Sequence, residues 1–444
     1  MNLEQIFRDI DASYDHYKDI LAEAVAIESV SGDPCRRPQT INMVHWTKER
    51  LEELGARCTL EDLGNQTIDG KEIPLPPVLL GQLGDDKKKK TVLVYGHLDV
   101  QPAAKEDGWN TEPFMLSESG NKLFGRGASD DKGPVLCWIH AVKMLQKHKV
   151  ELPVNIKFCF EAMEESGSIG LEGVLEKNKK KFFADVDFTC ISDSYWLGTT
   201  KPCLTNGLRG ICSFKVEVTG LQQDLHSGVY GGVVHEPLAD LLWVMSQLTS
   251  VDNRILIPGI YDDVAPMTVE ESALYDKIDF NVQDLSVHGI EGAFSGIGEK
   301  TVIPSRVVGN FSIRTVPYME PEKVNKMVID FLNELWRRRG SPNIFRPHLG
   351  HHALPWVADP NDANFKAGER AMKLVHGVDP DYIREGCTIP ITLTFQELTG
   401  KSVLLLPLGA ADDMAHSQNE KINKTNYVDG VKTLLAYLVE LGKA

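Results

Sequence analysis

The spacing of apolar residues changes along the chain, and each change marks a segment with a different predicted structure. Through the first sixty positions apolar residues recur at helical spacing, as in the runs 20–27 and 46–54. Short runs rich in β-branched and aromatic residues then alternate with helical stretches; the clearest are strands at 91–100, 155–164 and 187–192 and a helix at 133–148. This alternation predicts βαβ units around a largely parallel sheet.

A different pattern begins near residue 210, where ICSFKVEVTG alternates apolar and polar residues as a strand with one wet face does. A helix, a second alternating strand and another helix follow, at 237–248, 307–317 and 322–336. Buried-type strand and helix patterns return after residue 355. We therefore predict an α/β fold. A mostly parallel-sheet domain with helices on both faces, formed by 1–208 and 351–444, carries an inserted α+β, ferredoxin-like domain at 209–350.

Composition and charge narrow the function classes. The formal net charge of −16 disfavours phosphate backbones, and no basic stripe offsets it, so we expect no nucleic-acid partner. The N-terminus lacks the basic and apolar regions of a signal peptide, and no run approaches the ~18 apolar residues of a membrane span. Eight scattered cysteines without CxxC spacing favour reduced thiols. We expect a cytoplasmic protein with no membrane association.

Acidic residues and histidines follow several of the predicted buried strands. His97 and Asp99 end the first of these strands and share one of its faces because they are two residues apart. A metal-bound imidazole needs a hydrogen bond at its second nitrogen, and a carboxylate two residues on can accept it. A histidine followed two residues later by an aspartate is also common where the histidine binds no metal. Further ligands are therefore needed to support a metal site.

Three further strands and one loop deliver such groups, and each has a simpler explanation when it is taken alone. Asp130 and Asp131 precede a helix, where one of them can be its N-cap, while acids after strands can lie in wet turns. The remaining groups after strands are Glu164 and Glu165, Asp193, and Asp412, Asp413 and His416. The carboxyl ends of parallel strands meet at one edge of a sheet, so coincidence is the weaker explanation.

The number of candidate ligands indicates two metal ions. Two histidines and three carboxylates exceed the three protein ligands that a catalytic zinc normally takes. If one carboxylate bridges, each ion receives one histidine and one terminal carboxylate, and a shared water has room between them. Mixed nitrogen and oxygen ligation without thiolate fits Zn²⁺ or Mn²⁺, and the sequence does not choose between them.

Six ordered motifs resemble metallopeptidase family M20, and most closely its cytosolic dipeptidases. They are YGHLDVQPA, GRGASDDKGP, EAMEESGS, CISDSYW, DLHSGVYGG and GAADDMAHSQNE, and the similarity covers almost the whole chain. The resemblance implies that His97 and Asp193 bind one metal, Glu165 and His416 bind the other, and Asp130 bridges them. It further implies that Asp99 orients His97 and that Glu164, free of metal, is the general base acting on a metal-bridging water.

The resemblance also assigns the inserted domain to a lid that mediates dimerisation. His226 would complete the active site of the partner subunit and stabilise the oxyanion. Arg314 would pair with the C-terminal carboxylate of the peptide, and Thr301 would help to position it. Thr388 and His416 complete the implied substrate contacts.

Two departures from the family pattern concern this substrate side. REGCTIP places Thr388 where a serine is usual and Cys387 where a glycine is usual, and the stretch from YDKIDFNVQD to LSVHGIEGAFSG is shorter than in the family. The added methyl group of Thr388 can narrow the site, and the shortening falls in the domain expected to make the dimer.

The expected function is metal-assisted hydrolysis of dipeptides that have a free C-terminal carboxylate, carried out by a homodimer. One alternative within the same architecture is an amidohydrolase acting on N-acyl amino acids. Another is a catalytically silent binding or dimerising protein, which the shortened domain favours. The presence of five ligands and the base favours an enzyme.

Overall fold

The computed structural model describes residues 2–68, 70–266, 284–386 and 389–444. They form two compact units, the first made of Met1–Asn206, Ala358–Ile383 and Thr394–Ala444, and the second of Gly207–Val357 and Arg384–Leu393. The predicted domain boundaries placed 207–208, 351–357 and 384–393 in the catalytic domain, whereas these residues belong to the second unit. Residues 352 and 353 still pair with the strand that begins at Gly210, and the main-chain N–H of Arg209 donates to the main-chain oxygen of Glu385.

The first unit is built on a mixed sheet whose centre is parallel. The strands run in the order β1-β4-β8-β5-β9-β19-β10, with β18 beside β10. Their bounds are β1 Arg57–Glu61, β4 Val78–Leu83, β5 Thr91–His97, β8 Asn155–Glu161, β9 Phe188–Ile191, β10 Cys203–Leu208, β18 Asp381–Glu385 and β19 Val403–Leu405. The four neighbours β8, β5, β9 and β19 are mutually parallel, and β5 and β8 are buried throughout. Their carboxyl ends therefore meet at one edge of the sheet.

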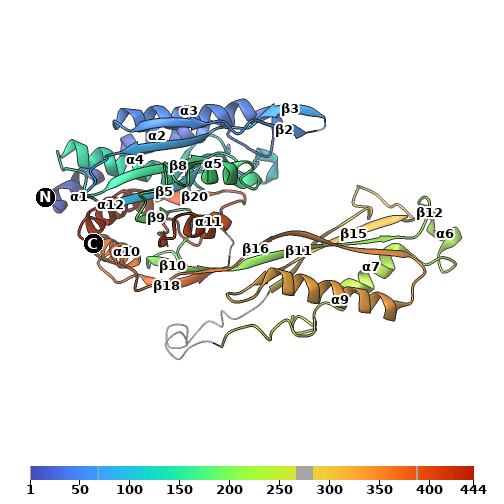
Figure 1. The fold of residues 1–444 in the computed structure, drawn as a ribbon. Helices are drawn as coiled ribbons and strands as arrows, with labels where there is room; N and C mark the ends of the chain where they lie inside the picture. Colours follow the sequence, from blue (N-terminus) through green and yellow to red (C-terminus); the bar gives the residue numbers. More distant parts are fainter. Residues whose placement is uncertain (1, 69, 267–283, 387–388) are drawn as a thin grey trace. The chain divides into compact units, whose positions relative to one another are not determined.

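Helices pack around this sheet (Figure 1). Helix α3 packs against β1 and β4, α4 against β5, and α10 against β19, while α12 packs against both α4 and α10. The bounds are α1 Leu3–Asp11, α2 Tyr14–Ala26, α3 Arg37–Glu53, α4 Lys132–Lys147, α5 Leu171–Asn178, α10 Ala363–His376, α11 Pro390–Thr399 and α12 Lys424–Leu441. Among the residues that the structure describes, no helix combines the length and the apolar character that crossing a membrane requires.

Short elements complete the first unit. They are the 3₁₀ turns Pro34–Arg36, Lys105–Asp107 and Glu164–Ser166, the hairpin of β2 Asn65–Ile68 with β3 Lys71–Pro74, and the small sheet β20-β7-β6, formed by Lys421–Asn423, Lys122–Phe124 and Ser117–Ser119. Strand β20 pairs with β7 and so joins two segments about 300 residues apart in the sequence.

The second unit has the predicted ferredoxin-like order β-α-β-β-α-β. Its main elements are β11 Gly210–Thr219, α7 Pro237–Ser246, β13 Asp284–Glu291, β15 Arg306–Thr315, α9 Pro321–Arg339 and β16 Ile344–Ala353. The sheet order β13-β15-β11-β16 is antiparallel throughout. Alternate residues of β11, from Cys212 to Val218, are buried in a core with α7 and α9, as its alternating sequence predicts. Smaller elements are β12 Leu225–His226, α6 Ser227–Tyr230, β14 Val302–Ile303 and β17 Trp356–Val357, which pairs with the end of β10.

The predicted fold class is confirmed. Within the first unit, one buried lysine connects the start of α4 to the end of α2. Lys132 is the first residue of α4 and is completely buried. Its Nζ donates to the main-chain oxygens of Ala24, at 2.9 Å, and Ile27, at 2.7 Å, at the end of α2. The Ala24 oxygen also accepts the main-chain N–H of Ile27, and the Ile27 oxygen accepts that of Ser29, so the lysine is a second donor to each carbonyl where α2 ends.

We predict that Lys132→Met lowers the free energy of unfolding by about 2–4 kcal/mol, because two buried carbonyls lose a charged donor and methionine fills the same space without replacing it. Urea unfolding followed by circular dichroism measures the change. Lys143→Met, on an exposed position of the same helix, is the matched control. Equal stability of the two variants would contradict this role for Lys132.

Candidate metal centre

Five predicted ligands lie together at the carboxyl edge of the parallel strands in the first unit. His97 is the last residue of β5, Asp193 follows β9 by two residues, and Glu165 lies in the 3₁₀ turn after β8. Asp130 lies just before α4, and His416 lies on the loop between β19 and β20. The five side chains come from positions more than 300 residues apart in the sequence. They meet because neighbouring strands of the sheet are parallel and end at the same edge.

The five side chains form two overlapping groups. In the first, Nε2 of His97 lies 2.9 Å from Oδ1 of Asp130 and 3.6 Å from Oδ2 of Asp193. In the second, Nε2 of His416 lies 3.1 Å from Oδ2 of Asp130 and 3.1 Å from Oε2 of Glu165. Within each group the potential ligand atoms all lie within 4.8 Å of one another. Asp130 is common to both groups and turns one oxygen toward each.

This donor set fits a pair of divalent cations. The carboxylates of Asp130 and Glu165 are almost fully buried, and such charges repel one another unless cations balance them. Hydrogen bonds to Asp130 and Glu165 raise the pKa of His416 to about 11. Burial lowers the pKa of His97, but its bonds to Asp130 and Asp193 raise that pKa well above its usual value. Both shifts have the same cause, the carboxylates that surround the two rings, and these carboxylates would also attract divalent cations.

Asp99 supports both the imidazole and the turn that carries the two glutamates. Nδ1 of His97 lies 3.1 Å from the main-chain oxygen of Asp99 and 3.5 Å from its carboxylate, so the main-chain oxygen is nearer than the carboxylate expected from the sequence. The Asp99 carboxylate accepts the main-chain N–H groups of Glu164, at 3.2 Å, and Glu165, at 3.1 Å. One buried side chain therefore positions residues from two neighbouring strand ends.

Asp131 does not cap α4 with its side chain, although capping was the simpler interpretation of the sequence. It is the N-cap residue, but its carboxylate makes no capping hydrogen bond. Instead, Oδ2 accepts the main-chain N–H of His97 at 3.1 Å. Asp131 therefore fixes the backbone of a candidate ligand, because β5 ends beside the loop that precedes α4.

The acids close to His416 stabilise its loop and belong to neither ligand group. Lys421 donates from Nζ to Asp412 and Asp413, at 2.6 Å each, and the second oxygen of Asp413 accepts the N–H of Ala410 at 2.9 Å. The sequence placed Asp412, Asp413 and His416 together after one strand. The nearby lysine separates them, since its ammonium group binds both aspartates and leaves the histidine for the metal centre.

Two supporting residues carried no diagnostic signal in the sequence. Gln101 donates from Nε2 to Oε2 of Glu165 at 2.8 Å and so orients a candidate ligand. Glu420 is fully buried and accepts main-chain N–H groups from the loop of Asp130. Glutamine and glutamate in loops are most often solvated, so only their tertiary contacts identify them.

Apart from His416, which lies in the first unit, the predicted substrate contacts belong to the second unit or lie outside the described residues. His226 is exposed, and its neighbour Ser227 donates a main-chain N–H to the oxygen of Thr301 at 3.1 Å. Arg314 is half-buried on β15, in register with Asp284 of β13. Thr388 and Cys387 are outside the described residues.

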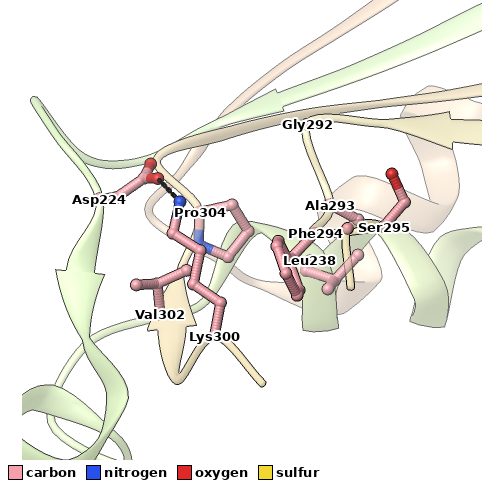
Figure 2. Close-up of a pocket in the computed structure, with 10 residues that line it drawn as sticks. Asp224, Leu238, Gly292, Ala293, Phe294, Ser295, Lys300, Val302 and Pro304 are labelled. Atoms are coloured by element: carbon pink, nitrogen blue, oxygen red, sulfur yellow. Dashed lines mark ion pairs between the residues drawn. The ribbon is translucent and has the colours of Figure 1, made fainter. Parts of the chain in front are cut away.

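A cavity of about 520 Å³ lies in the second unit close to the strand pair that holds His226. Figure 2 shows Leu238 and Phe294 on one side and the ion pair of Asp224 with Lys300, at 3.9 Å, on the other. Val302 also lines this cavity, and it is the cross-strand partner of His226. The cavity combines apolar surface with one ion pair, whereas the titratable groups that suit catalysis lie in the first unit.

Comparison with known proteins gives a consistent family. The family model described as peptidase family M20/M25/M40 matches residues 93–440. The Cys-Gly metallodipeptidase dug1 of Schizosaccharomyces pombe is 44% identical over 469 residues, covering 99% of this chain and 98% of that protein. The Beta-Ala-His dipeptidase of Rattus norvegicus is 46% identical over 471 residues, covering 99% and 96%. The crystal structure of human carnosine dipeptidase 1 matches with a TM-score of 0.93 and 44% identity, covering 100% and 99%. This chain therefore belongs to peptidase family M20.

Proposed function

We propose that this chain is a metallodipeptidase that hydrolyses dipeptides with a free C-terminal carboxylate. The observation that carries the proposal is the pair of ligand groups sharing Asp130, with half-buried Glu164 next to the candidate ligand Glu165 in the same turn. The relatives named as Cys-Gly and Beta-Ala-His dipeptidases, which match over nearly the whole chain, support this substrate class.

The ligand assignment follows the two groups. His97 and Asp193 would hold one ion, Glu165 and His416 the other, and Asp130 both. Nitrogen and oxygen donors without thiolate suit Zn²⁺ or Mn²⁺. When bound, such ions acidify a water molecule and polarise the peptide carbonyl.

Glu164 is the proposed general base. It precedes Glu165 but is in neither ligand group, and Asp99 holds the main-chain N–H of both. Burial raises the pKa of Glu164 well above its usual value, which favours a carboxylate able to accept a proton and release it again. It accepts a proton from the attacking water and passes it to the leaving amine.

The second unit supplies the proposed substrate contacts. Arg314 would pair with the C-terminal carboxylate, and Thr301 and Thr388 would position the peptide beside His416. Nδ1 of His226 accepts the N–H of Gly228 at 3.0 Å, so in the neutral ring Nε2 carries the proton and is the free donor. A donor of this kind suits oxyanion stabilisation in the partner subunit of a homodimer.

A cytoplasmic location is part of the same proposal. The seven cysteines that the structure describes are free thiols, and five of them are buried. Free buried thiols are typical of a reducing compartment.

The direct test is a hydrolysis assay on the metal-stripped full chain after reconstitution with Mn²⁺ or Zn²⁺. Cys-Gly, β-Ala-His and an N-acetyl amino acid form the substrate panel. Cleavage of dipeptides supports the proposal, while preference for the acylated substrate favours the amidohydrolase alternative. Inactivity on every dipeptide with both metals would refute it.

Within this assay, we predict that Glu164→Gln lowers kcat by roughly 10²–10⁴-fold, because the amide cannot accept the proton. The variant should retain both ions, since Glu164 is in neither ligand group. Metal content by mass spectrometry is therefore the control, and near-normal turnover with full metal content would show that Glu164 is not the base.

Metal uptake should release protons at pH 7.5. Because the pKa of His416 is about 11 in the metal-free protein, its ring is protonated at this pH and must lose a proton to become a ligand. Calorimetric titrations with Mn²⁺ in buffers of different ionisation enthalpy measure the number released. His416→Ala should release at least about one proton fewer per subunit. Equal heats in all buffers would contradict this prediction.

Mixing two inactive variants tests whether His226 acts across a dimer. A hybrid of His226→Ala and Glu164→Gln subunits contains one site with an intact Glu164 and an intact partner His226. Random exchange should restore roughly a quarter of wild-type turnover, since half of the dimers are hybrids with one complete site. If His226 instead acts within its own subunit, the mixture stays inactive.

A further inference from the structure

The Glu420 carboxylate is surrounded by hydrogen-bond donors from the loop that carries Asp130. It accepts the main-chain N–H groups of Gly127, at 3.0 Å, Ser129, at 3.1 Å, and Asp130, at 3.1 Å. The Ser129 hydroxyl, at 3.3 Å, and Nη1 of Arg126, at 2.8 Å, are also donors. The side chain is 0% exposed, so protein groups alone satisfy it.

The same segment of chain carries His416. Glu420 follows it by four residues, and the main-chain oxygen of Glu420 accepts the N–H of Gly125 at 3.0 Å. Nη2 of Arg126 donates to the oxygen of Ser417 at 3.2 Å. The loop that carries Asp130 and the loop that carries His416 are thus linked through Glu420 and Arg126. The pairing of β20 with β7 adds main-chain hydrogen bonds between the same two segments.

The loop of His416 needs such support because its backbone is strained. His416, Met414 and Asn419 have φ values of 60°, 57° and 60°, in the left-handed region that residues other than glycine rarely adopt. Strained conformations persist only where the surrounding structure determines them strongly. Within this loop, Glu420 and Lys421 make the buried ion pairs that hold its C-terminal end.

The chemistry of the contact requires a carboxylate. Five groups donate to Glu420, and a carboxylate provides acceptor sites on both oxygens with no hydrogen to oppose them. Glutamine has the same shape, but its NH₂ group would face main-chain N–H groups. The substitution therefore removes acceptors and introduces repulsion without creating a cavity.

We propose that Glu420 is a positioning residue that sets the separation of Asp130 and His416 and thereby the affinity of the second metal position. The inference rests on the proposed two-metal function, since it assigns how one of the two ligand groups is kept in place.

The test is calorimetric titration of the metal-stripped full chain with MnCl₂, alongside the metal-free melting temperature. Glu420→Gln should weaken Mn²⁺ binding by roughly 10–100-fold, the range for residues that orient metal ligands. Glu440→Gln is the matched control. Like Glu420, Glu440 is largely buried, at 9% exposed, and it pairs with an arginine, Arg370, at 2.6 Å. That variant should lose stability but keep wild-type Mn²⁺ affinity.

Glu420→Asp separates positioning from folding, because it keeps the negative charge beside Arg126 but shortens the reach to the loop. It should fold and bind Mn²⁺ with intermediate affinity, and it replaces Glu420→Gln if the latter is insoluble. Wild-type Mn²⁺ affinity in the soluble Glu420 variants, together with a lowered melting temperature, would overturn the inference and leave a purely structural role. Absence of Mn²⁺ binding by the wild-type chain would instead refute the proposed function.

Discussion

The rest of this structure depends on one electrostatic constraint, the repulsion among acidic side chains gathered at the carboxyl edge of the central parallel strands. The central parallel strands end side by side, so Asp130 lies close to both Asp193 and Glu165, and the side chains of all three are at most 12% exposed. Like charges at such distances raise the free energy of the folded state unless cations or protons balance them. Divalent cations held by these carboxylates together with His97 and His416 would supply that balance.

Further buried acids serve the backbone of the site. Asp99, Asp131 and Glu420 each accept main-chain N–H groups next to a candidate ligand. A carboxylate suits this role because it accepts several hydrogen bonds and donates none. The site thus has an inner layer of acids facing the metal positions and an outer layer holding strand ends and loops. This arrangement explains why so many acidic residues are tolerated in the interior of the first unit.

The second unit has a simpler physical basis. Its ferredoxin-like sheet buries one face against α7 and α9, while the other face remains polar. The pairing of β12 with β14 brings the main chain of Ser227 to Thr301, about 75 residues apart in sequence, and leaves His226 exposed. Its Nδ1 caps α6 by accepting the N–H of Gly228, which leaves Nε2 directed away from that contact.

The sequence predicted the fold class, which is confirmed, and the family resemblance named five candidate ligands that the structure brings together in two groups. Periodicity distinguishes buried parallel strands from strands with one wet face, and acids or histidines after buried strands predict a shared edge. The structure alone decided which acids face one another. Asp412 and Asp413 resemble ligands in sequence, yet both accept hydrogen bonds from Lys421, and Asp131 resembles a cap, yet its carboxylate accepts the main-chain N–H of His97. Glu420 gave no signal at all, because its five donors come from a loop about 290 residues earlier, and hydrogen bonds between distant segments leave no local pattern in a sequence.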